Sequence, residues 1–205
     1  MLVDMTPSPT NTNLFLHVNH FAEKTDWLHA PMLAMANYGI LLFFALLIIG
    51  WLYARRQSVA KVGAVVWSGL GTLLAVAVNQ PLVHIFRENR PFMNLHDILV
   101  LGHHSIDYGF PSDHSTMAGA VATGLFLVNP VLGCIAVVFA LLLAFSRVYI
   151  AVHYPFDVMA GLLVGAAVML ISYFVVRKLL TFVLTKLLNT PLRLLITAKP
   201  VHHEE

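Results

Sequence analysis

Residues 109–120 read GFPSDHSTMAGA, and this stretch places two ionisable residues where an apolar helix begins. The small residues that follow, as far as about 128, predict a short helix rich in Ala and Gly. Ser112 is a good N-cap residue, and Asp113 suits a first helical turn. Helix capping does not require His114. We therefore interpret the helix start as an anion site, because its N–H groups are unpaired and carry the positive end of the dipole.

The rest of the chain has the composition of an integral membrane protein. Of its 205 residues, 59% are hydrophobic and 11% are charged, whereas soluble domains have roughly 45–50% and about 25%. A spanning helix needs about 20 mostly apolar residues. Stretches that meet or approach this length lie at about 32–53, 62–86, 114–128, 131–150 and 156–178. We expect an all-α integral membrane fold with five or six transmembrane helices, in one domain over residues 1–205.

The flanking segments suit the membrane surface rather than its interior. Residues 13–30 mix apolar side chains with Glu23, Lys24 and Asp26, which is typical of an interfacial amphipathic helix. Residues 179–197 are predicted to continue the last spanning helix and then lie along the surface. The net charge of +2, without a dense basic run, gives no reason to expect a nucleic-acid partner.

Lys and Arg residues are distributed unevenly between the two ends of the predicted spans, and cytoplasmic loops carry the excess in membrane proteins. One side holds Arg55, Arg56, Lys61, Arg177, Lys178, Lys186, Arg193 and Lys199, and the other holds Lys24, Arg87, Arg90 and Arg147. We therefore expect the second side to face outward, as in a protein of a bacterial inner membrane. The start of the 114–128 helix lies on that outward side.

Ionisable residues gather at the outward side from the ends of four predicted helices. Such clustering at spanning-helix ends predicts a functional site, because charges there are costly unless solvated or paired. The site candidates are Arg87, Arg90, Ser112, Asp113, His114, Arg147, His153 and Asp157.

Two further motifs support a phosphate site. In RENRPF, residues 87–92, Arg90 precedes a proline that should end the second span, and its guanidinium suits phosphate oxygens. In SRVYIAVHYPFD, residues 146–157, His153 lies four residues before Asp157. A carboxylate that accepts the Nδ1–H of an imidazole leaves Nε2 free as a nucleophile. Together the motifs supply the groups for phosphoryl transfer without a metal or other cofactor.

The three motifs resemble the signatures of the type 2 phosphatidic acid phosphatase (PAP2) superfamily. They are Arg90-Pro91, PSDH at 111–114, and Ser146-Arg147 with His153 and Asp157. The residues within these motifs are most similar to those of bacterial undecaprenyl-diphosphate phosphatases of the bacitracin-resistance type. The resemblance covers a motif core at about 84–160. It implies an enzyme that hydrolyses a polyprenyl diphosphate lipid to the monophosphate and phosphate.

The resemblance also implies a role for each motif residue. His153 would be the nucleophile that forms a phosphohistidine, and Asp157 would orient it. His114 would be the general acid that protonates the leaving oxygen. The phosphoryl oxygens would be held by Arg90, Arg147 and Ser112, and such charge stabilisation is usually the largest catalytic term.

The sequence departs from the family pattern at two positions. The family has a Lys seven positions before the Arg of Arg-Pro, where this chain has Val83, next to His84. We expect Arg87 to supply the missing charge at the phosphate site. The other departure is Asp113, which replaces a common Gly. Asp113 belongs to the phosphate site by position, but its carboxylate would repel phosphate unless turned away, so we expect a capping or leaving-group-side role.

Alternatives remain open on the sequence alone. A phosphatidate or phosphatidylglycerophosphate phosphatase would carry the same motifs. The eleven His residues suggest a metal-binding membrane protein or transporter, but Arg residues beside the motif His disfavour a bound cation. The loop with His103, His104 and Asp107 is either a lid or a solvated loop. Asn79 and Gln80 either line the site or bond between helices, and the oligomeric state stays open.

Overall fold

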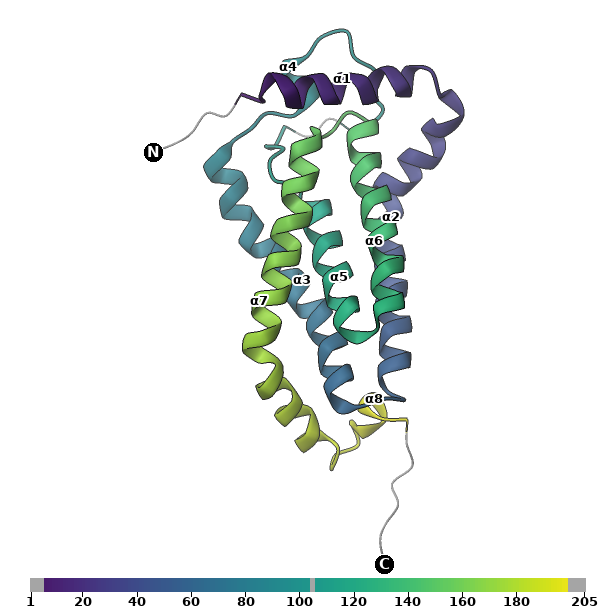
Figure 1. Cartoon of the computed structure of the whole chain (residues 1–205), viewed down its shortest axis with the longest axis vertical. Helices are drawn as coiled ribbons and strands as arrows, with labels where there is room; N and C mark the ends of the chain where they lie inside the picture. Colours follow the sequence, from purple (N-terminus) through teal and green to yellow (C-terminus); the bar gives the residue numbers. More distant parts are fainter. Residues whose placement is uncertain (1–5, 104–105, 199–205) are drawn as a thin grey trace, which may run out of the picture.

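The computed structural model of the chain describes residues 6–103 and 106–198. Within these ranges all regular elements are helices, which confirms the all-α expectation (Figure 1). They are α1 (Pro9–Glu23), α2 (Asp26–Ala54), α3 (Val59–Phe86), α4 (Pro91–Asn94), α5 (Asp113–Val128), α6 (Pro130–Tyr149), α7 (Pro155–Leu187) and α8 (Arg193–Ile196).

Among the residues that the structure describes, four segments are long and apolar enough to cross a membrane by length and composition. They are Asp26–Ala54, Val59–Asn94, Pro130–Tyr149 and Pro155–Leu187. The predicted span at about 114–128 corresponds to α5, which has 16 residues and is shorter than the roughly 20 that a helix needs to cross the hydrocarbon core alone. It lies between longer helices instead, where the surrounding protein replaces lipid as its environment (Figure 1).

Helix α5 forms the centre of the bundle and packs against α3, α6 and α7. Small residues make this packing close. A Cβ on Gly119 would overlap the backbone of Leu162, and one on Gly165 would overlap the backbone of Thr116. Gly161 and Gly165 thus bring α7 against α5, as small residues do between membrane helices.

Large apolar side chains lie on the outside of the bundle. Leu73 on α3 is 69% exposed, and Leu163 and Val175 on α7 are 70% and 76% exposed. In water such a surface would be unfavourable, whereas facing hydrocarbon it costs nothing. The exposed surface therefore fits a membrane protein.

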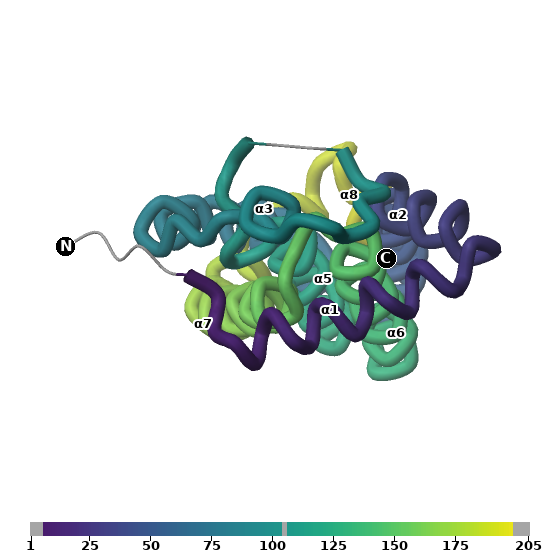
Figure 2. Tube along the Cα trace, turned by 90° about the horizontal axis from the view of Figure 1, so that it is seen from above, coloured from purple at the N-terminus to yellow at the C-terminus, as the bar shows by residue number. Residues whose placement is uncertain are grey.

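Helix α1 lies across one end of the bundle (Figure 1) and, seen from above, passes α7 and α6 on its way to α2 (Figure 2). It is held there by buried amides. Asn19 donates to the Leu99 carbonyl (2.7 Å) and accepts from the Leu99 N–H (3.0 Å). Asn11 accepts a hydrogen bond from the Phe156 N–H (3.0 Å). The predicted interfacial segment 13–30 is thus split, because α1 ends at Glu23 and Trp27 belongs to α2.

Candidate active site

The three motifs meet at the end of the bundle that α1 covers (Figure 1). The sequence explains how each is placed. Pro91 starts α4 as its first residue and holds Arg90 in an extended conformation, so α3 has already ended at Phe86. Ser112 is the N-cap of α5. Pro155 starts α7 directly after the loop that carries His153.

His153 and Asp157 form a buried pair. The His153 Nδ1 atom lies 3.4 Å from Asp157 Oδ2, and the side chains are 3% and 0% exposed. The same oxygen accepts the Tyr154 N–H at 2.8 Å, so the start of α7 fixes the carboxylate. With Nδ1 turned to the carboxylate, Nε2 is the nitrogen left for chemistry.

Arg90 lies against that nitrogen. Its Nη1 atom is 3.2 Å from His153 Nε2 and donates to the Val152 carbonyl at 2.9 Å. On its other side, Nη2 forms an ion pair with Asp107 Oδ1 at 3.1 Å. An anion bound at Arg90 would thus lie next to Nε2, in competition with the Asp107 carboxylate for the same donors.

A polar cavity of about 270 Å³ joins these groups. Arg90, Arg147, His114, His153 and Asp113 line it, so the structure brings together residues from all three motifs. Arg147 comes from the last turn of α6, and its Nη1 lies 3.5 Å from the Ala36 carbonyl. Two guanidinium groups facing one small cavity would attract an anion to it.

The electrostatics of this cavity keep the nucleophile candidate neutral. Burial lowers the pKa of His153 well below its ordinary value of 6.5, and the charges of Arg147 and Arg90 lower it further. A neutral imidazole has the lone pair that attack on phosphorus needs. The Arg residues that would hold phosphate therefore also keep His153 reactive.

Asp113 is turned toward α3. Its Oδ1 accepts from Asn79 (2.8 Å), and Gln80 donates to Oδ1 and Oδ2, each at 2.9 Å. Asn79 also donates to the Pro111 carbonyl at 3.0 Å. The interhelical role that we left open for Asn79 and Gln80 is the one observed. They fix the PSDH turn and occupy both oxygens of the carboxylate.

Ser112 and Arg87 lie outside the set that lines the cavity. Ser112 is the N-cap of α5, but its side chain makes no capping hydrogen bond and is fully buried. Its N–H donates to the Asp157 carbonyl at 3.1 Å, which joins the second motif to the third. Arg87 is exposed, its Nε donates to the His84 carbonyl (3.1 Å), and its guanidinium lies 6.0 Å from the Tyr108 ring centre. The structure therefore does not bring Arg87 to the phosphate site.

Two residues that line the cavity were not singled out from the sequence, Asn37 of α2 and Tyr108. His103 and Asp107, from the loop that we considered as a lid, line it as well. His104 lies outside the described residues. For Asn37 the available signal was an amide within an apolar span. Across the described ranges, no group of three or more His, Cys, Asp or Glu side chains is arranged to hold a metal ion.

Known proteins share both the sequence and the fold. The PAP2 superfamily model matches residues 64–180. Undecaprenyl-diphosphatase BcrC of Bacillus subtilis (strain 168) is 30% identical over 155 residues, which cover 76% of this chain and 78% of that protein. Crystal structures of Aquifex aeolicus LpxE and of the first transmembrane PAP2 type phosphatidylglycerolphosphate phosphatase from Bacillus subtilis have similar folds. The LpxE structure has a TM-score of 0.60 and covers 85% of this chain and 99% of its own. The phosphatidylglycerolphosphate phosphatase has a TM-score of 0.59 and covers 83% of this chain and 88% of its own. Each is 24% identical in sequence to this chain.

The region that matches the family model contains all three motifs, from Arg90 to Asp157. It also contains the helices α5, α6 and the start of α7 that place them. The match spans more than half of the chain, and the resemblance drawn from the motifs is confirmed: this membrane protein belongs to the PAP2 superfamily.

Proposed function

We propose that this membrane phosphatase hydrolyses undecaprenyl diphosphate to undecaprenyl phosphate and inorganic phosphate. The observation that carries the proposal is the position of Arg90 Nη1, 3.2 Å from His153 Nε2 in a cavity that Arg147 and His114 also line. The likeness to the Bacillus subtilis undecaprenyl-diphosphatase supports the choice of lipid.

The reaction would proceed in two steps. First, Nε2 of His153 attacks the terminal phosphorus, which forms the N–P bond and breaks the P–O bond to the lipid phosphate. The departing oxygen would take its proton from His114, which must be protonated once the anionic diphosphate is bound. Water then attacks the phosphohistidine and gives its proton to His114, the N–P bond breaks, and phosphate leaves. Arg90 and Arg147 would hold the phosphoryl oxygens through both steps.

The membrane orientation is part of the proposal. The site lies at the α1 end, whereas most Lys and Arg residues belong to the opposite end, where α8 lies (Figure 1). By the positive-inside rule the site would face the periplasm or the exterior of a bacterial inner membrane. There the enzyme would regenerate the carrier lipid for cell-wall synthesis.

Orientation is tested with single cysteines in a Cys134→Ser background. His20 and Asn189 are exposed residues near opposite ends of the bundle. A membrane-impermeant thiol reagent added to intact cells is expected to label His20→Cys and not Asn189→Cys, whereas lysed cells should show both. The reverse labelling in intact cells would place the site in the cytoplasm.

Activity is tested with purified protein in detergent and EDTA. Phosphate release from undecaprenyl diphosphate and from phosphatidate is measured for the wild type and for His153→Ala. Exposed His20→Ala, on α1, is the matched control. We expect fast release from the diphosphate, lost only in His153→Ala, and an acid-labile phosphoenzyme from labelled substrate. Preference for phosphatidate would refute the substrate, and release that needs a divalent metal would refute the mechanism.

A further inference from the structure

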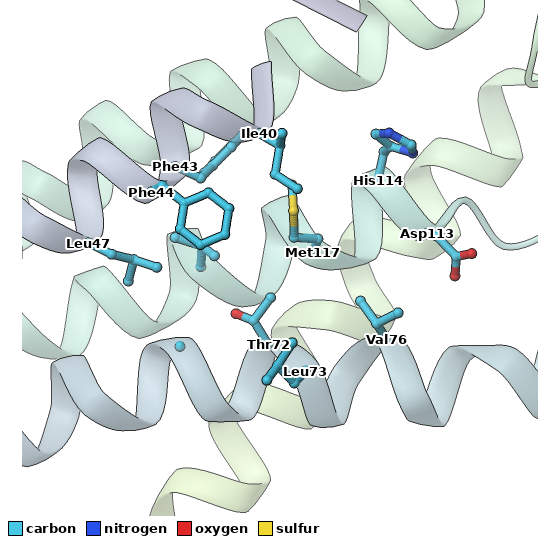
Figure 3. A pocket seen from close by; sticks show the side chains of 12 residues that line it. Ile40, Phe43, Phe44, Leu47, Thr72, Leu73, Val76, Asp113, His114 and Met117 are labelled. Carbon is cyan, nitrogen blue, oxygen red and sulfur yellow. The ribbon is translucent and has the colours of Figure 1, made fainter. Parts of the chain in front are cut away.

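A second cavity, of about 330 Å³, lies between α2, α3 and α5. Its walls are almost wholly apolar: Figure 3 shows Phe43 and Phe44 from α2, Leu73 from α3, and Met117 from α5. Thr72 is the polar residue part-way along, and its hydroxyl donates to the Ser68 carbonyl of its own helix at 2.6 Å. The cavity therefore offers hydrocarbon contact and little hydrogen bonding.

This cavity, the apolar groove, begins where the polar cavity ends. His114 and Asp113 line both cavities, and they point in different directions from the start of α5 (Figure 3). His114 is the proposed donor to the leaving oxygen, so the atom bonded to that oxygen lies at the mouth of the groove. Asn79 and Gln80 hold the Asp113 carboxylate against α3 at this junction.

The groove is also open to the surrounding hydrocarbon. Phe44 and Leu73 form part of its walls, and their side chains are 57% and 69% exposed. Both lie on helices that are long and apolar enough to span the membrane. A lipid chain can therefore enter sideways from the bilayer without crossing water, which keeps its burial favourable throughout.

We propose that the apolar groove binds the first isoprene units of a single-chain polyprenyl substrate, directly behind its phosphates. This proposal rests on the proposed function and deepens it by assigning the site that binds the lipid chain and distinguishes one chain from two. A polyprenyl chain leaves its phosphate as one strand and needs one groove. A diacyl lipid divides into two chains at the glycerol, beside the phosphate, and needs room for both at the mouth.

Gly69 provides the means to test the groove. It lines the cavity, and a Cβ built on it would meet nothing within 4 Å. A larger side chain there therefore begins in open space at the wall of the groove, and it favours the helix, since Gly is a poor helix former. Gly69 lies two helical turns, about 10 Å, further along α3 than Val76 at the Asp113 end. A five-carbon substrate should therefore end before it.

The experiment compares Gly69→Leu with Ala77→Leu, which adds the same bulk at an exposed position of α3 outside the groove. The substrates are undecaprenyl diphosphate and isopentenyl diphosphate. We expect Gly69→Leu to raise KM for the long substrate about fifteenfold, the loss of two buried methylenes at about a factor of four each. KM for the short substrate should stay unchanged. Gly69→Ala should give a smaller rise, and Ala77→Leu none.

The outcomes separate this proposal from the proposed function. If the wild type hydrolyses undecaprenyl diphosphate but Gly69→Leu leaves its KM unchanged, the groove is not the chain site. The same conclusion follows if Gly69→Leu weakens both substrates equally, because the effect is then not one of chain length. If the wild type instead prefers phosphatidate, both the single-chain assignment and the proposed function are wrong.

Discussion

Asn11 lies far from the motifs in sequence but is bonded to the start of the helix that carries Asp157. Its side chain is 2% exposed, and its Oδ1 accepts the Phe156 N–H at 3.0 Å. Phe156 follows Pro155, the first residue of α7, so this N–H has no partner within the helix. Asn11 thus acts as an N-cap supplied by another helix. We expect it to be a positioning residue for the His153–Asp157 pair.

The loss of stability in Asn11→Leu can be estimated from the hydrogen bond that the substitution removes. Loss of a capping side chain costs about 1 kcal/mol, and the N–H left without a partner raises the cost to about 2 kcal/mol. For a chain of this length, 2 kcal/mol corresponds to a fall in Tm of about 6 °C. If the start of α7 shifts, the pair shifts with it, and a sub-ångström displacement of reacting groups costs about tenfold in kcat.

The assay is phosphate release from undecaprenyl diphosphate, with kcat and KM determined separately, alongside a thermal unfolding curve. We expect Asn11→Leu to lower kcat about tenfold with KM unchanged, and Asn11→Asp, which keeps the acceptor oxygen, to retain most of the activity. Asn13→Leu, at an exposed position of the same helix, is the control. A lowered Tm with unchanged kcat would refute the positioning role and leave Asn11 a purely structural cap.

Three further predictions address the site and the bundle. Burial and two Arg residues lower the pKa of His153, so the acid limb of kcat/KM should lie below pH 6.5. The free energy of unfolding should also fall as the pH drops below 6.5, because only the unfolded state then takes up a proton at His153. Asp107→Asn should lower KM about threefold, because it removes a charge that competes with phosphate for Arg90. Gly165→Leu should prevent folding or lower Tm by about 6 °C or more, because its side chain would overlap the Thr116 backbone.

Each of these has a result that would contradict it. A His153 imidazole that titrates at or above pH 6.5, measured by NMR of the folded protein, would mean that it is charged in the resting enzyme. A raised KM in Asp107→Asn would mean that Asp107 orders Arg90 for phosphate rather than competing with it. For Gly165→Leu, the counter-result is a Tm equal to that of the wild type in the same detergent.

Much of the site could be predicted because spanning helices have few ways to arrange their ends. Once the spans were placed, Arg90, His114, Arg147 and His153 had to lie at one end of the bundle, and they line one cavity. The prediction for Arg87 rested on sequence distance alone. The left-handed backbone at this residue, with φ 52°, ends α3 and turns the side chain toward Tyr108 instead.

The remaining features depend on contacts that no local pattern encodes. Asn11 reaches Phe156 across a separation of 145 residues, and Asn37 joins the cavity as a single amide within an otherwise apolar stretch. Helix α7 continues past the predicted span end at 178 as far as Leu187, as we expected for the residues that follow the span. Arg177 and Lys178 do not stop it, because long basic side chains extend toward the interface while their helix goes on.

The close contact between α5 and α7 has a consequence for how the protein loses its activity. The Ser112 N–H bond to the Asp157 carbonyl and the glycine contacts at Gly119 and Gly165 join the two halves of the site through the most tightly packed pair of helices. No partial opening of the bundle can separate these helices and keep the site. Amide hydrogens of α5 should therefore exchange only through global unfolding, and heat inactivation should follow the same curve as loss of helix.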